Sequence, residues 1–181
     1  MDYKNVKLKT ATRVVCKQGI IPFTLNDTAI EIINIIVGNN IDELDFISSF
    51  SEMSSQTVVQ LVTSSGFNES KIIEIGDRLA EKGLVFNQPN SSRVMVYRLL
   101  PFMAVGLMEY MFMREIKYTE EEKRLAVMFG QMLQKLNDQT QKNYDKLIPQ
   151  FENMPPIDRT VPPQKNNEGK SIKTISVKKR I

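Results

Sequence analysis

This sequence contains few kinds of side chain that could act in catalysis or bind a metal. Its 181 residues include 24 Lys or Arg and 21 Asp or Glu, but only one cysteine and no histidine. A structural zinc site needs about four Cys, His or carboxylate ligands, and a four-iron cluster needs about four thiolates. Ser-His-Asp and Cys-His catalysis both need a histidine. We therefore expect a non-catalytic chain that holds no metal and no cofactor of its own.

The remaining reactive groups give no stronger signal. Cys16 has no disulfide partner within the chain, and it stands next to Lys17, a cation of the kind that lowers a thiol pKa. We interpret it as an incidental thiol. Carboxylate pairs such as Asp42 and Glu43 fall on predicted surface turns. We assign them neither a metal-binding nor a catalytic role.

Charge is distributed unevenly along the chain. The formal net charge is +3, made up of +4 over residues 1–20, −6 over residues 21–157 and +5 over residues 158–181. A protein body that binds duplex DNA normally has the opposite, basic character. No apolar run reaches the about 20 residues of a membrane-spanning helix, and the N-terminus does not read as a signal peptide. We expect a cytoplasmic protein without a membrane partner.

Apolar periodicity and capping residues place the elements that would position these groups. Residues 1–23 read as an extended lead-in. A buried helix is expected to end at Gly38, although its β-branched residues leave a strand as the alternative. A second short helix follows, then a helix that ends at Gly66 and another that begins after Asn68 and ends before Gly83.

Two short strands come next, over residues 84–86 and 93–99, with a turn at 88–92 between them. Helix, short turn, helix and β-hairpin together indicate a winged helix-turn-helix. The fold class is therefore mainly α with a small β-hairpin, and residues 24–100 form the winged-helix domain.

A helical extension is predicted over residues 101–150. Thr119 and Glu122 have the spacing of a capping box that opens its long helix, which is expected to fray near Asn137. Residues 151–181 read as a Pro-rich basic tail or linker with little fold of its own. The apolar, Met-rich side chains of the extension either fill the core or form an interface with a second copy or another domain, with these interface candidates: Met103, Leu107, Met108, Met111, Phe112, Phe129 and Met132.

Part of the chain also resembles a known family. The run DRLAEKGLV at 77–85 precedes LPFMAVGLMEYMFMR at 100–114, and Arg159-Thr160-Val161-Pro162 follows later. Over roughly residues 20–163 this order resembles the N-terminal region of bacterial and archaeal ferredoxin-type iron–sulfur proteins. The resemblance implies a winged helix and a helical extension ahead of a domain with paired four-iron clusters.

The chain departs from that group in one respect. No C-x-x-C-x-x-C-x-x-x-C run follows residue 163, so no cluster ligand can be carried over to this sequence. We expect either a part of a longer protein or a relative that lacks the cluster domain. The 4Fe-4S clusters are implied only for a downstream domain.

Two functions remain open for the predicted winged helix. Its helix over 68–82 would read bases if the protein bound DNA, yet it carries four acidic and three basic side chains. We favour a docking or regulatory module of an iron–sulfur electron-transfer protein, which contacts a protein partner, the missing cluster domain or a second copy. The alternative is a DNA-binding transcriptional regulator, with these contact candidates: Asn68, Ser70, Lys71, Arg78 and Arg93. The basic ends predict only weak binding of nucleic acid.

Overall fold

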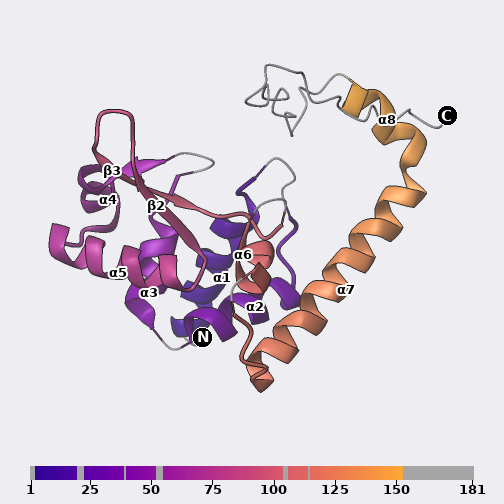
Figure 1. Ribbon diagram of the computed structural model, residues 1–181, viewed down its shortest axis with the longest axis horizontal. Coiled ribbons are helices and arrows are strands. Elements are labelled where there is room, and N and C mark those ends of the chain that lie inside the picture. The colour runs from indigo at the N-terminus through magenta and orange to yellow at the C-terminus, as the bar shows by residue number, and fades with distance from the viewer. Residues whose placement is uncertain are drawn as a thin grey trace, which may run out of the picture. The chain divides into compact units, whose positions relative to one another are not determined.

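The computed structural model describes residues 3–19, 23–38, 40–51, 55–103, 106–113 and 115–152 (Figure 1). These residues form eight helices and one small antiparallel sheet of three strands. The chain divides into two compact units, residues 1–136 and 137–181. The prediction of a mainly helical fold with a small β element is confirmed.

Helix α1 (Tyr3–Cys16) opens the first unit. Leu8, Ala11 and Val15 are buried on one face, at the spacing of three and four that a helix requires. This face packs against α2 and α3. The prediction of an extended lead-in over residues 1–23 is therefore wrong, because charged residues between the apolar ones hide a helical period.

Helices α2 (Asp27–Val37) and α3 (Ile41–Ser48) follow, each with an asparagine cap. The side chain of Asn26 accepts a hydrogen bond from the backbone N–H of Ala29 at 2.9 Å. Asn40 caps α3 in the same way. The first of these two segments is a helix and not the alternative strand, since its cap is satisfied and one face is buried in the core.

The next segment holds the sheet. Its elements are β1 (Gln56–Thr57), α4 (Val58–Ser65), α5 (Glu69–Glu81), β2 (Val85–Pro89) and β3 (Met95–Leu99). Both pairings are antiparallel, and the strand order is β1-β3-β2. Figure 1 shows α3, α4 and α5 grouped beside this sheet. Strand β1 was not predicted, because two residues give no measurable periodicity.

Two further helices lie C-terminal to the hairpin. Helix α6 (Leu107–Met113) lies within the predicted helical extension at 101–150. The capping box of α7 (Glu120–Lys142) is confirmed: the Glu122 N–H donates to the Thr119 hydroxyl at 3.2 Å, and the Thr119 N–H donates to the Glu122 carboxylate at 3.3 Å. Helix α7 does not fray near Asn137 but continues without a break to Lys142.

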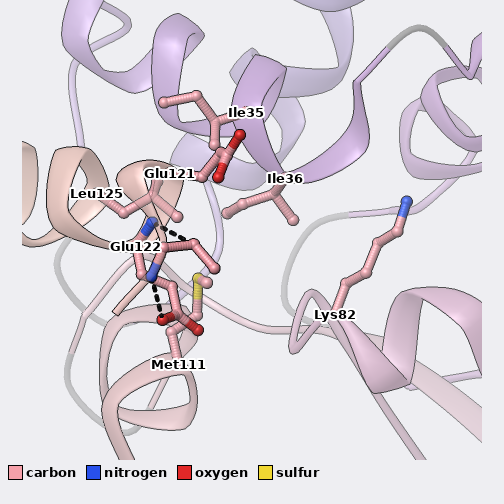
Figure 2. A pocket seen from close by; sticks show the side chains of 8 residues that line it. Ile35, Ile36, Lys82, Met111, Glu121, Glu122 and Leu125 are labelled. Atoms are coloured by element: carbon pink, nitrogen blue, oxygen red, sulfur yellow. Dashed lines mark hydrogen bonds between the residues drawn. The ribbon is translucent and has the colours of Figure 1, made fainter. Parts of the chain in front are cut away.

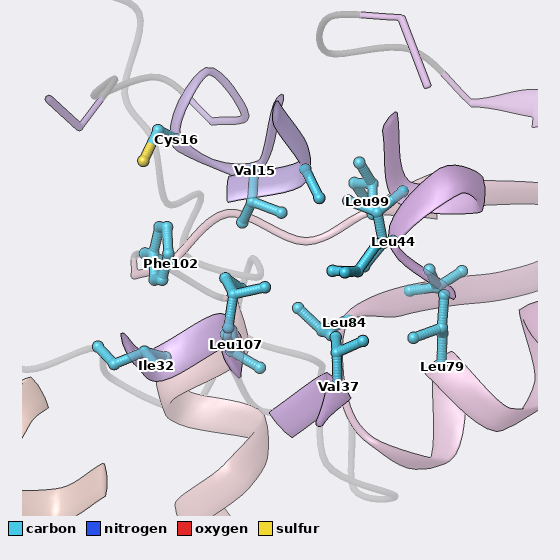
Figure 3. Packing of buried hydrophobic residues seen from close by; sticks show 14 of the residues in the cluster. Val15, Cys16, Ile32, Val37, Leu44, Leu79, Leu84, Leu99, Phe102 and Leu107 are labelled. Atoms are coloured by element: carbon cyan, nitrogen blue, oxygen red, sulfur yellow. The ribbon is translucent and has the colours of Figure 1, made fainter. Parts of the chain in front are cut away.

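One hydrophobic core joins the elements of the first unit. Figure 3 shows side chains from distant parts of the sequence gathered in it, among them Val15, Ile32, Leu44, Leu79, Leu99, Phe102 and Leu107. Leu125, Met128, Phe129 and Met132 of α7 belong to the same cluster. The predicted extension at 101–150 is thus divided: its residues up to 136 share the core of the first unit.

The second unit begins at Asn137 with the end of α7 and contains α8 (Tyr144–Glu152), which has Pro149 inside it. Of the predicted tail at 151–181, the residues from 153 onward lie outside the described part of the chain. A search of the described helices finds none with the length and apolarity that a membrane span requires.

Candidate functional site

Helix α5 is fixed at both ends by local hydrogen bonds. Asn68 accepts one from the Lys71 N–H at 2.9 Å, as its position before the helix predicted. Gly83 adopts a left-handed conformation with φ of 77°, which confirms its predicted role at the C-terminus. The N–H groups of Gly83 and Leu84 donate to the carbonyls of Ala80 and Leu79 at 3.0 and 2.9 Å. These bonds complete a Schellman motif and set the direction of β2.

The basic side chains of α5 lie on the side of the helix that faces α3. Lys71 pairs with Asp42 at 2.8 Å and lies over the ring of Phe67 at 4.5 Å. Arg78 pairs with Glu43 at 3.3 Å and also with Glu74. Two of the predicted DNA-contact residues are therefore engaged with carboxylates of the chain itself.

Glu43 is the centre of this charge cluster. Its side chain is only 1% exposed, whereas Arg78 and Lys82 remain about one-third exposed. One carboxylate oxygen accepts hydrogen bonds from Arg78 and from Asn40 at 3.2 Å, and the other accepts one from Lys82 at 2.6 Å. The expectation that Glu43 lies on a surface turn is wrong, because α5 covers it and supplies its counter-charges.

The opposite side of α5 borders a groove of about 400 Å³. Helix α4 contributes Val58 and Val59, while β3 and the residue before it contribute Met95, Tyr97 and Val94. Glu69, Ile73 and Asp77 of α5 complete the lining, four residues apart along one stripe of the helix. Several apolar side chains here are open to solvent, since Val59 is 74% exposed and Ile73 and Met95 are each 40% exposed.

The floor of the groove depends on close contact between α5 and β3. Gly76 is buried against the ring of Tyr97, and a Cβ atom at this position would lie 2.4 Å from Cε1 of that ring. Asp77 accepts a hydrogen bond from the Asn87 amide at 2.9 Å, which ties α5 to β2 beside the groove. Burial, and secondly the Asp77 charge, raise the pKa of the Tyr97 hydroxyl, so it stays neutral.

The hairpin turn carries the last of the predicted DNA contacts. Asn90 accepts hydrogen bonds from the N–H groups of Ser92 and Val94 at 2.9 and 3.0 Å. These bonds place the turn between Pro89 and Met95, slightly later than the predicted 88–92. Arg93 has a positive φ of 62° in this turn and is exposed, as is Ser70 at the start of α5. Of the five DNA-contact candidates, Lys71 and Arg78 thus lie in ion pairs with carboxylates, whereas Asn68, Ser70 and Arg93 are exposed.

The predicted interface residues are located mainly in the interior of the first unit. Met103, Leu107, Met111, Phe129 and Met132 are buried. Met108 and Phe112 pack against the same core, with the Phe112 and Phe129 rings edge to face at 6.0 Å. The role of these residues in an interface remains a prediction, and in this conformation they contact the chain's own helices.

A second hollow, of about 190 Å³, lies among α2, α6 and the start of α7 (Figure 2). Three of its polar side chains already have partners: Thr119 and Glu122 cap α7, and Lys82 points away toward Glu43. Among the described residues, no group of three or more Cys, Asp or Glu could hold a metal ion. A four-iron cluster does not fit this chain either, which has one cysteine where about four thiolates are needed.

Cys16 is buried in the core, where desolvation raises the pKa of its thiol to about 11. The neighbouring Lys17 does not reverse this effect of burial. The thiol therefore has none of the thiolate character of a reactive cysteine.

Sequence reasoning missed the groove and the burial of Glu43. Ile73 gave a signal for the groove, since it is apolar but lies off the helix stripe of Ile72, Ile75 and Leu79 that fills the core. Comparison of the chain with protein-family models, with curated proteins and with solved structures finds no match.

Proposed function

We propose that the predicted domain at 24–100 contains a winged helix-turn-helix, formed by the elements over residues 41–99, that docks another protein. The order of elements from α3 to β3 supports this fold: helix, strand, helix, helix and a two-stranded hairpin, with β1 pairing to the far side of β3. Gly66, with φ of 74°, allows the tight turn between α4 and α5.

One observation carries the choice of protein over DNA. The surface between α5 and the hairpin is an apolar groove with Glu69 and Asp77 in its lining, while Lys71 and Arg78 pair with carboxylates. Phosphates need unengaged cations at their contact surface. Exposed apolar side chains grouped around a hollow are instead typical of protein interaction sites.

A gel-shift series tests this choice. We expect the full chain to bind random duplex DNA weakly, in the range of about 10⁻⁴–10⁻⁶ M, with strong dependence on salt. The double substitution Lys71→Ala and Arg78→Ala should change that affinity little. Lys135→Ala with Lys146→Ala removes the same charge from exposed sites elsewhere and serves as the matched control.

Deletion of residues 164–181 should remove most of the weak binding, because this segment carries a net charge of +5. The opposite pattern would favour the alternative, a DNA-binding regulator. In that case the chain would bind one sequence with nanomolar affinity, lose it on the Lys71 and Arg78 substitutions, and keep it after the deletion.

We further propose, from the sequence resemblance alone, that the docking serves a ferredoxin-type iron–sulfur protein. The sequence encoded after Ile181 tests this part. Two C-x-x-C-x-x-C-x-x-x-C runs there would support it, and a stop codon would remove its basis.

A further inference from the structure

Building on the docking role, we propose that the groove between α4, α5 and β3 binds an extended polypeptide segment with a large apolar side chain between two basic ones. Each feature of such a segment has a counterpart in the groove. No DNA, acidic peptide or purely apolar surface has the same complementarity.

The large apolar side chain of the bound segment would contact the apolar residues that line the groove. Ile73 lies midway between Glu69 and Asp77 along α5, and Val59 of α4 and Met95 of β3 line the groove with it. These side chains keep 40% or more of their surface in contact with water. A Phe, Leu or Ile side chain placed among them would remove apolar surface from water on both molecules, which is the main source of affinity at such sites.

The basic positions are matched by two carboxylates on the same stripe of α5. Glu69 and Asp77 stand four residues before and four residues after Ile73, which places each about 6 Å from it along the helix axis. Both are exposed, and the Asn87 amide holds Asp77 in place. The groove therefore presents negative, apolar and negative groups in that order.

Strand geometry gives the spacing of the partner. Alternate residues of an extended segment point to the same side and stand about 6.6 Å apart. A basic residue, an apolar residue and a second basic residue at positions i, i+2 and i+4 would therefore face Glu69, Ile73 and Asp77 in register. Each ion pair would be exposed and modest in energy, but together they would select basic segments over acidic ones.

The test uses the full chain, labelled with ¹⁵N, and three nine-residue peptides. The first has phenylalanine at its centre, lysine two residues to each side, and serine or glycine elsewhere. In the second, glutamate replaces both lysines, and in the third, serine replaces phenylalanine. Chemical-shift titration at low salt measures the three dissociation constants and identifies the residues that respond.

We expect the basic peptide to bind at least about tenfold more tightly than the other two and to shift the signals of α5 and β3. The double reversal Glu69→Lys with Asp77→Lys should invert the preference, so that the acidic peptide becomes the tighter ligand. Glu81→Lys with Glu115→Lys changes the net charge equally at exposed sites outside the groove lining. This control should leave the order of the peptides unchanged.

A third variant separates this proposal from the docking role on which it rests. Ile73→Ser should weaken every peptide that binds, with little effect on folding because Ile73 is partly exposed. If Ile73→Ser weakens binding but the charge reversal does not change the preference, the chemistry proposed for the partner is wrong and docking stands. If Ile73→Ser changes nothing, or no peptide binds, the groove is not the docking site.

Discussion

Gly76 packs directly under an aromatic ring, so the smallest substitution there should be costly. An alanine Cβ at this position would lie 2.4 Å from Cε1 and 2.9 Å from Cδ1 of Tyr97. Tyr97 is 1% exposed, and its strand pairs with β1 on one side and β2 on the other. Tyr97 therefore cannot move away without opening the sheet or displacing α5.

Two opposing effects set the magnitude. Alanine is favoured over glycine in a helix interior by about 1 kcal/mol. Overpacking of a core typically costs about 1–3 kcal/mol, and contact with a rigid, enclosed ring belongs at the upper end. We therefore expect Gly76→Ala to lower the free energy of unfolding by about 1–2 kcal/mol.

Gly130 offers a matched control for this substitution. It lies in the middle of α7, and beyond the adjacent residues and backbone of that helix a Cβ atom at this position would meet nothing within 4 Å. Gly130→Ala should therefore raise the free energy of unfolding by up to about 1 kcal/mol, from helix propensity alone. Urea unfolding followed by circular dichroism at a helical wavelength measures both. If the two variants were stabilised to the same extent, the packing of α5 against β3 would be refuted.

Three further predictions concern charged and reactive groups. Glu43→Gln should lower the free energy of unfolding by about 1–3 kcal/mol, since Arg78 and Lys82 lose the carboxylate charge with which both pair. A urea unfolding curve identical to that of the wild type would contradict this. The Cys16 thiol, with its pKa raised to about 11 by burial, should react with a thiol reagent far more slowly in buffer than in concentrated urea; equal rates would contradict it. The pKa of Lys7 is raised above the ordinary 10.5, mainly by its hydrogen bond to Asp45. The stabilisation that this ion pair gives the fold is therefore fully present below pH 10.5 and is lost as the pH rises above that value. Asp45→Asn should thus be less stable than wild type near neutral pH, and the difference should shrink above pH 10.5 in melting curves.

Elements with local signals were predicted well. Asn68, Gly83 and Thr119 each act on backbone groups within a few residues, so the sequence around them contains the whole interaction. Helix α1 had such a signal too, in the spacing of Leu8, Ala11 and Val15. The charged residues between these apolar ones obscured the helical period, although the sequence contained all that was needed to predict the helix.

The burial of Glu43 has a different cause. Its partners Arg78 and Lys82 lie 35 and 39 residues further along the chain. No spacing rule connects them, because only the packing of α3 against α5 brings the three together. On the predicted surface turn, Glu43 needed no partner from a distant segment, so its neighbours in the sequence did not reveal its burial.

The same long-range packing changes the electrostatic character of α5. The sequence of residues 68–82 has a net charge of −1, which is close to neutral and argues only weakly against DNA binding. With Lys71, Arg78 and Lys82 paired to carboxylates, the cations of the helix are already neutralised on the side of α3. On the groove side, the charges that α5 presents are Glu69 and Asp77. A partner that approaches there meets a surface more acidic than the sequence total implies, and this asymmetry favours a basic polypeptide over a nucleic acid.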